Sequence, residues 1–374
     1  MKNHKEVLIL GGGLAGLTAA IHLSKLGLRV TVIEKNCYPK HKVCGEYISN
    51  EVLPYFEWLG IDIAKLNPTS ITKLQFSTQN GTTITTKLPL GGFGISRYAL
   101  DFHLYNIALS NGCVFIRETV ENVVFDYDTF TITTSIGTLL KSKIVLGAFG
   151  KRSVIDVKLN RNFIQKKSPW LAVKAHYYGD FSNDLVGLHN FKGGYCGVSK
   201  VENNMINICY ITNYETYKLY KNNEEFQEKV LSENPHLKLL FEKATLIFEK
   251  PLTIGQISFD KKEAVENHIL MIGDTAGLIH PLCGNGMAMA VHSAKIASEL
   301  VINYYDCKST SRASLEKEYS KKWKFHFQKR LKVGRFIANL LQQPRIASIL
   351  MLILVQFPFL LAIIIKKTHG KPIL

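Results

Sequence analysis

Acidic side chains are scarce in this sequence, and its cysteines lack paired spacing. Asp and Glu number 30 against 46 Lys and Arg, so the net charge at pH 7 is +16. This excess favours an acidic partner, and because no nucleic-acid motif is present we rank anionic lipid first. The seven cysteines include no C-x-x-C pair, which indicates reduced thiols in a cytoplasmic setting and predicts no metal site.

The sequence also contains no recognisable repeat, low-complexity linker or signal peptide. We expect no signal peptide because a strand-like apolar run starts as early as Val7. The chain has 374 residues, of which 46% are hydrophobic. This is enough for two domains with buried cores.

The first 34 residues carry the clearest pattern. Two apolar strands, residues 7–10 and 29–33, flank a helical run at 14–26. Three glycines in G-x-G-x-x-G spacing join the first strand to the helix: Gly11, Gly13 and Gly16. Such glycines allow a tight turn, let a pyrophosphate approach the backbone, and let the helix pack closely on the strand. An acidic residue after the second strand accepts hydrogen bonds from the ribose hydroxyl groups. The predicted dinucleotide contacts are Gly11, Gly13, Leu14, Ala15, Gly16, Glu34 and Lys35.

The loop after the second strand contains KVCGE, at residues 42–46. Together with the opening unit, this loop resembles FAD-dependent proteins of the geranylgeranyl reductase and aromatic-hydroxylase superfamily. The resemblance implies that three residues lie beside the flavin ring: Cys44, Gly45 and Glu46. For Cys44 a small buried thiol is an equally good interpretation.

The resemblance extends to two later positions. Arg97 starts a predicted amphipathic helix at residues 95–112 and is expected to contact FAD, although an exposed i,i+4 pair with Asp101 is the alternative. A buried strand ends in Phe149-Gly150, where hydroxylases of the superfamily usually carry Asp-Gly. Gly150 is therefore expected near FAD, whereas Phe149 puts a hydroxylase-like NAD(P)H site in doubt.

Residues 268–301 resemble the second FAD motif of the same superfamily, with a strand at 269–272 and a helix from about Met287. The resemblance implies that an Asp holds the ribityl chain and that the helix N-terminus faces the flavin pyrimidine. The implied contacts are Gly273, Asp274, Pro281, Gly284, Gly286 and Met287. The resemblance also places His280 and Cys283 near the flavin, and for both we favour a structural role over a catalytic one. No flavinylation motif is present, so we predict non-covalent FAD.

The middle of the chain predicts an inserted antiparallel sheet. Residues 71–87 alternate around Asn80-Gly81, a signal for a two-residue hairpin, and further strands are expected at 171–178, 186–191 and 205–212. The substrate motifs of geranylgeranyl reductases and of flavin halogenases are both absent, so we reject halogenation. Tyr195 is a candidate pocket residue, with a core aromatic as the alternative.

The tail has two further predicted segments. Residues 315–341 predict a basic amphipathic helix. The apolar run 346–365 is long enough to span a bilayer. Two alternatives stay open for this run, which are a helix that lies on the membrane surface and a helix that packs on the protein. The predicted fold is α/β, a Rossmann-like FAD-binding domain with an inserted antiparallel-sheet substrate domain and a helical C-terminal tail. The expected boundaries are 1–68, 91–160 and 260–310 for FAD binding, 69–90 and 161–259 for substrate, and 311–374 for the tail.

These patterns predict an FAD-dependent oxidoreductase that acts on a hydrophobic, lipid-like or aromatic small molecule. Hydroxylation with O2 and reduction of a prenyl-lipid double bond both stay open, as does a non-catalytic flavin-binding membrane module. NAD(P)H or a partner reductase is the expected electron source. No catalytic side chain stands out, because the cofactor supplies the chemistry. We expect a cytoplasmic protein, peripheral on the inner face of the membrane.

Overall fold

The computed structural model describes residues 5–374 apart from 308–309, 342, 344–352, 355 and 358. Its first sheet has six strands, in the order β17 (Val265–Glu266), β18 (Ile269–Met271), β10 (Ile144–Gly147), β1 (Glu6–Leu10), β2 (Arg29–Ile33) and β6 (Val114–Ile116). All neighbours from β18 to β6 pair in parallel, and β17 is antiparallel. The carboxyl ends of the parallel strands therefore share one edge, where ligands of such sheets bind.

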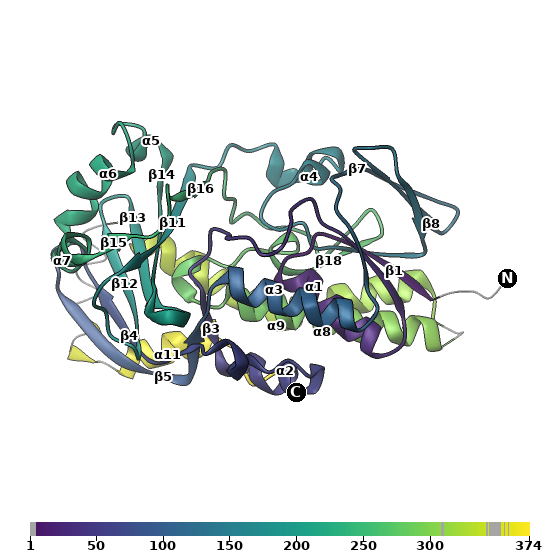
Figure 1. Cartoon of the computed structure of the whole chain (residues 1–374), viewed down its shortest axis with the longest axis horizontal. Coiled ribbons are helices and arrows are strands. Elements are labelled where there is room, and N and C mark those ends of the chain that lie inside the picture. Colours follow the sequence, from purple (N-terminus) through teal and green to yellow (C-terminus); the bar gives the residue numbers. More distant parts are fainter. Residues whose placement is uncertain (1–4, 308–309, 342, 344–352, 355, 358) are drawn as a thin grey trace.

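Helices cover one side of this sheet: α1 (Leu14–Lys25), α3 (Arg97–Ser110) and α8 (Gly286–Asp306). Figure 1 shows them below β1 and β18, with the three-stranded sheet of β7 (Val120–Asp126), β8 (Thr129–Thr134) and β9 (Leu139–Ser142) above. The sequence predicts an apolar inner face of α3 made of four residues, of which Leu100, Leu104 and Ala108 are fully inaccessible and Ile107 is half-buried. Two short helices, α2 (Leu53–Leu59) and α4 (Val154–Lys158), complete this half.

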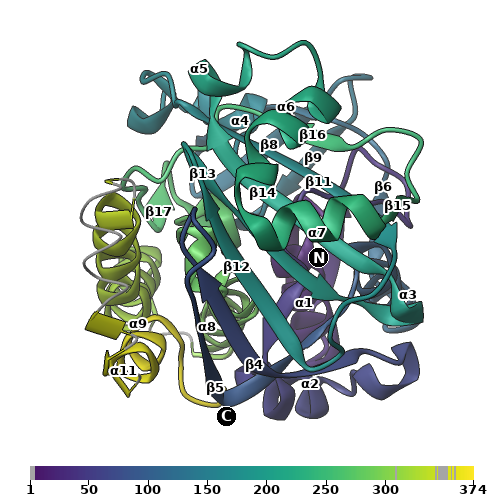
Figure 2. The same ribbon diagram turned by 90° about the vertical axis from the view of Figure 1, so that its left-hand side faces the viewer.

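The second sheet has nine strands and is mainly antiparallel. Its path is β15 (Thr245–Leu246), β11 (Trp170–Tyr178), β14 (Ile206–Asn213), β13 (Gly194–Lys200), β12 (Leu185–Phe191), β4 (Thr69–Ser77), β5 (Thr83–Gly94) and β3 (Tyr47–Ser49), with β16 (Leu252–Ile254) beside β11. Three helices follow in sequence: α5 (Tyr214–Tyr217), α6 (Asn223–Lys229) and α7 (Pro235–Lys243). Figure 2 shows α6 and α7 in front of this sheet, and their apolar side chains pack on its outer face. The predicted α/β class with an antiparallel sheet and C-terminal helices is confirmed.

Three local predictions differ from the structure. The hairpin loop has three residues, 79–81, because the Thr78 N–H donates to the Thr82 carbonyl at 3.0 Å. Strand β13, which contains Tyr195, was not among the strands predicted from the sequence. The helix expected from Ile48 starts later, since this residue belongs to β3.

The C-terminal helices pack on both halves of the molecule. The predicted amphipathic helix forms as α9 (Arg312–Leu341), and its inner face is buried at the apolar residues that recur every four positions: Leu315, Tyr319, Trp323, Phe327 and Leu331. Leu361 and Ile365 of α11 (Phe359–Thr368) pack with side chains of β4 and β5. Nine residues of the predicted apolar segment 346–365, namely 346–352, 355 and 358, lie outside the described residues. Among the helices that are described, none combines the length and hydrophobicity needed to cross a membrane.

Candidate functional site

The glycine turn between β1 and α1 depends on contacts that leave no room for a Cβ atom. Gly11 has a φ of +107°, and a Cβ there would overlap the Ala148 carbonyl group after β10. A Cβ on Gly16 would overlap the Gly11 carbonyl oxygen, so α1 packs directly on the turn. Leu14 and Ala15 are buried in the first turn of α1. The N-terminus of α1 is thus fixed at the ligand-binding edge of the sheet.

Gly13 faces open space between two cations. A Cβ at Gly13 would lie 3.7 Å from Arg97 Nη2 and 3.8 Å from Lys42 Nζ. Asp101 holds both cations, with 2.7 and 2.8 Å hydrogen bonds from Arg97 and a 3.0 Å ion pair with Lys42. Within the part of the chain that the structure describes, no side chain caps the N-terminus of α1. Two cations and free helix N–H groups around this space fit the pyrophosphate of a dinucleotide.

Asp101 stays ionised although it is buried. Burial alone would raise the pKa of its carboxyl group, but Arg97 and Lys42 hold that pKa below its usual value. The i,i+4 ion pair between Arg97 and Asp101 forms, as the alternative interpretation predicted. It is not exposed, however, because the two side chains are only 13% and 1% exposed. Asp101 therefore positions two cations for an anion. The sequence pattern does not single out Lys42 as a site residue, because it is one of several lysines in a loop.

Glu34 lies across the turn from Gly12. Its carboxylate accepts a hydrogen bond from the Gly12 N–H at 2.9 Å and two from Asn36, at 2.9 and 2.6 Å. A carboxylate has about four acceptor positions, so capacity for a ribose hydroxyl remains. The Tyr38 hydroxyl donates to the Gly12 carbonyl at 2.5 Å, while the Lys35 side chain is exposed.

Gly273 brings the second glycine segment against the first. It has a φ of +62°, and a Cβ there would lie 2.9 Å from the Ala15 Cβ in α1. The adjacent Asp274 is half-buried and lies near Arg97. Burial would lower the pKa of the Arg97 guanidinium, but Asp101 and Asp274 raise it above its usual value. The Gly150 N–H binds the same segment, at 2.8 Å from the hydroxyl of Thr275.

The loop that follows leads into α8. Pro281 is exposed, and Gly284 is left-handed with a φ of +60°. α8 begins at Gly286, one residue before the predicted start, and Met287 is buried. The Asn285 side chain forms hydrogen bonds with other parts of the chain and does not cap α8. α8 therefore presents free N–H groups, as α1 does. With the cationic space at Gly13 and the acceptor at Glu34, these groups fit FAD.

Cys44 and Gly45 lie where the loop at residues 42–46, which we call the flavin loop after its predicted contact, meets the second sheet. Cys44 is half-buried, and its carbonyl oxygen accepts a 3.3 Å hydrogen bond from Asn207 Nδ2 on β14. Gly45 is exposed, and a Cβ there would have no neighbour within 4 Å. This open position leaves room for a ligand at the loop.

Glu46 is fully buried and its carboxylate joins three structural elements. Lys174 Nζ lies 3.0 Å from Oε1, His176 Nε2 lies 2.6 Å from Oε2, and the Arg97 N–H donates to Oε1 at 2.8 Å. Burial would raise the pKa of Glu46, but Lys174 and His176 hold it below its usual value. Glu46 thus links the flavin loop to β11 and α3. Sequence reasoning missed Lys174 and His176, although a Lys and a His two residues apart in an apolar strand share one face.

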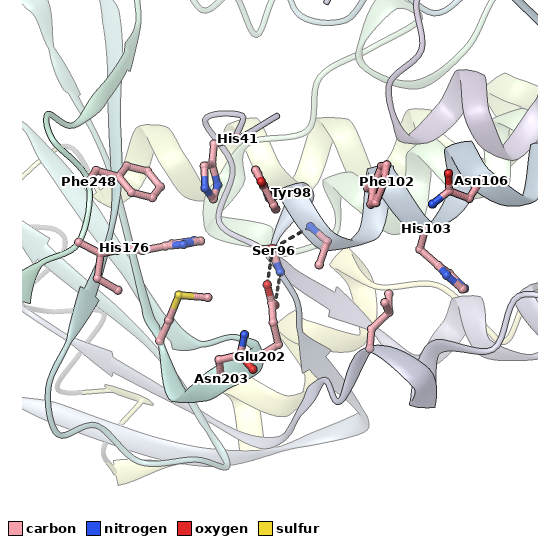
Figure 3. Close-up of a pocket in the computed structure, with 14 residues that line it drawn as sticks. His41, Ser96, Tyr98, Phe102, His103, Asn106, His176, Glu202, Asn203 and Phe248 are labelled. Carbon is pink, nitrogen blue, oxygen red and sulfur yellow. Dashed lines mark hydrogen bonds between the residues drawn. The ribbon is translucent and has the colours of Figure 1, made fainter. Parts of the chain in front are cut away.

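A cavity of about 460 Å³ opens beside this cluster. Figure 3 shows His41, Tyr98 and Phe248 around it, with His176 pointing inward. The rings of His41 and Tyr98 stack with 4.5 Å between centroids. Burial and Lys174 lower the pKa of His41 to about 4, so this imidazole is neutral at pH 7. Among the described residues, His41 Nδ1 and His176 Nδ1 are buried without a hydrogen-bond partner.

A second group of orphaned polar atoms lies in an aromatic cluster beside the α8 loop. The ring of His280 is 4.6 Å from Phe259, 5.5 Å from Tyr195 and 6.4 Å from Trp170, between centroids. In the described part of the chain, neither ring nitrogen of His280 has a hydrogen-bond partner, and the Tyr195 hydroxyl has only the nearby Leu282 backbone, without good hydrogen-bond geometry. Burial lowers the pKa of His280 to about 4. Tyr195 is thus a core aromatic by burial, yet it adjoins the predicted cofactor loop.

Comparison with known proteins agrees with this geometry. The family described as "FAD binding domain" matches residues 4–322. The chain belongs to this family. Its relatives in the FAD-binding family include the digeranylgeranylglycerophospholipid reductase of Methanosarcina acetivorans, 25% identical over 87% of this chain and 81% of the relative. Another is conditioned medium factor receptor 1 of Dictyostelium discoideum, 23% identical over 86% of this chain and 68% of that protein.

Solved structures of flavin-dependent enzymes share the fold. The flavin-dependent brominase Bmp2 superposes with a TM-score of 0.80 at 18% identity and covers 98% of this chain and 93% of its own. The flavin-dependent halogenase CmlS gives 0.76 at 19% identity, over 89% of this chain and 64% of its own. At these identities the likeness establishes the fold of the FAD-binding family and carries no halogenation to this chain.

Gly13→Val is expected to abolish FAD binding, because the side chain would fill the space between Arg97 and Lys42. Asp274→Ala should weaken binding by roughly 1.5–3 kcal/mol through loss of a charged hydrogen bond. The measurement is flavin content by absorbance in purified, folded protein. Gly255→Val is the matched control, since a Cβ there has only Leu171 Cδ1 as a neighbour, at 3.9 Å. Normal flavin content in both site variants would contradict the assignment.

Proposed function

We propose that this protein is an FAD-dependent oxidoreductase whose hydrophobic substrate, lipid-like or aromatic, lies against Tyr195 and His280. The observation that carries the proposal is the set of buried, unpartnered polar atoms in the aromatic cluster beside the α8 loop. Leaving such atoms unpaired costs about 1–3 kcal/mol each, which a substrate hydroxyl or carbonyl group would recover.

The chain's own residues supply binding, orientation and exclusion of water. Leu278, Ile211 and Ala172 form an apolar wall next to Tyr195, which favours a substrate with an extended apolar part. His280, neutral at pH 7, offers one acceptor and one donor nitrogen. Bound FAD supplies the hydride or oxygen chemistry.

Reduction of a lipid double bond is our first candidate reaction. The KVCGE loop and the reductases among the relatives support it. Aromatic hydroxylation is the second candidate, because the Tyr195 hydroxyl and His280 together suit a phenol. The net charge of +16 makes an anionic membrane the surface where a lipid-like substrate would be met.

Chemically reduced enzyme mixed anaerobically with a geranylgeranyl lipid is expected to reoxidise, with two hydrogens added to the lipid. Flavin absorbance gives the rate, and mass spectrometry gives the product. Reoxidation that waits for O2 and puts oxygen into an aromatic substrate would contradict reduction and support hydroxylation.

In the same assay Tyr195→Phe should slow substrate turnover or raise the half-saturating concentration roughly tenfold, through loss of one hydrogen bond. Tyr210→Phe is the matched control. Tyr210 is also buried with an unpartnered hydroxyl, but it packs in the cluster beneath α6 and α7. Equal effects of the two variants would argue against a substrate contact by Tyr195.

The electron source is a separate proposal, in which a partner reductase or substrate binding promotes flavin reduction. Phe149 offers a pyridine nucleotide neither charge nor hydrogen-bond acceptor. Lys151 and Arg152 are the rival anchors for its phosphates, but Lys151 Nζ donates to the Val43 carbonyl at 3.0 Å. This contact engages one of the two cations.

We therefore predict slow flavin reduction by NADPH or NADH alone, measured by anaerobic stopped-flow absorbance. Phe149→Asp should raise the rate if the side chain is the cause, and Phe149→Leu, which adds no acceptor, should not. Rapid bleaching of the unmodified enzyme by NADPH, without substrate or partner, would overturn this interpretation of position 149.

A further inference from the structure

The outward side of α9 carries a regular row of exposed cations and phenylalanines. Its members recur every three or four residues over four turns and are Lys321, Phe325, Lys329, Lys332 and Phe336. They lie opposite the buried face that begins with Leu315 and Tyr319. We call these five residues the basic-aromatic face.

The two phenylalanines are exposed where the fold does not require it. Phe325 is 82% and Phe336 is 64% exposed, although the inner side of the same helix buries Trp323 and Phe327. Eleven residues of helix separate the two rings by roughly 16 Å. Exposed aromatic rings on a helix whose other face is already packed indicate a second contact surface.

The charge that α9 itself contributes around these rings has one sign, and the acidic residues Asp260 and Glu263 line a hollow beside Lys332. Residues 321–341 contain seven Lys and Arg and no Asp or Glu. The ion pairs of this stretch involve Lys322 and Arg330, which flank the basic-aromatic face and contact Glu318 and Glu51. The face itself therefore presents cations around two apolar rings, which complements an anionic surface with an apolar interior.

A neighbouring helix repeats this composition. Exposed residues of α11 include Phe359 and Ile363, followed by Lys366 and Lys367. Figure 2 shows α9 and α11 together at one side of the molecule, with strand β17 of the first sheet next to α9. The composition thus extends over adjacent elements.

We propose that the basic-aromatic face docks the protein on an anionic lipid bilayer, with Phe325 and Phe336 in the headgroup region and the three lysines on lipid phosphates. This inference rests on the proposed function, because a lipid-like substrate is the reason why the enzyme would need a membrane-binding surface. Aromatic rings flanked by lysines are typical of helices that lie in the membrane interface.

Co-sedimentation of the full-length protein with vesicles tests this without turnover. The protein should pellet with phosphatidylcholine–phosphatidylserine vesicles and far less with phosphatidylcholine alone. Lys329→Gln with Lys332→Gln should lower the partition coefficient about 30-fold, since each cation near an anionic surface is worth ~1 kcal/mol. Phe325→Ser with Phe336→Ser should lower it roughly tenfold, at low and high salt alike.

Tyr127→Ser is the control, because Tyr127 is an aromatic residue that is 94% exposed in the turn between β7 and β8. It should bind vesicles as the unmodified protein does. Full binding by both double variants, no binding to anionic vesicles, or a dimer in light scattering that Phe325→Ser dissociates would overturn the proposal. FAD content and anaerobic reoxidation stay measurable in each variant, so failure of the docking surface and failure of the proposed activity give different results.

Discussion

The position of the flavin loop relative to the second sheet depends on one buried carboxylate, that of Glu46. Lys174 and His176 from β11 and the Arg97 N–H from α3 all converge on it. A buried charge is tolerable only while its partners remain, and removal of one partner of such a pair typically costs about 3–5 kcal/mol. The same loop places Lys42 at Gly13 and Cys44 at β14. The Glu46 cluster therefore fixes a loop that contacts both the glycine turn at Gly13 and strand β14 of the second sheet.

How far the sequence predicts this site depends on the range of the interactions. The glycine turn, β2 and the start of α8 follow from local geometry, and their predicted bounds agree with the structure to within one residue. The Glu46 cluster was not predictable in the same way, because it requires the register of β11 against a loop 128 residues earlier. Strand β13 was not predicted, because its two glycines weaken the strand pattern, and its pairing with β12 and β14 is a long-range feature of the sheet. The burial of Asp101 likewise arises from tertiary packing.

The two faces of the second sheet have different roles in the proposed mechanism. The outer face packs Tyr210 and Phe226 under α6 and α7 as ordinary core. The inner face presents Lys174 to the flavin loop and Tyr195 to the α8 loop. Enclosure by this sheet would shield reduced flavin from water, which suits a hydrophobic substrate that enters from a membrane surface.

Two glycine segments far apart in the chain meet where Gly273 packs on Ala15 of α1, and we expect them to hold one FAD without a covalent bond. Denaturation of the purified full-length protein, followed by mass spectrometry of the released flavin, tests this. We expect free FAD in the supernatant, close to one per chain, and a colourless precipitate. Flavin that stays with the precipitated chain, or folded protein that never contains FAD, would contradict it.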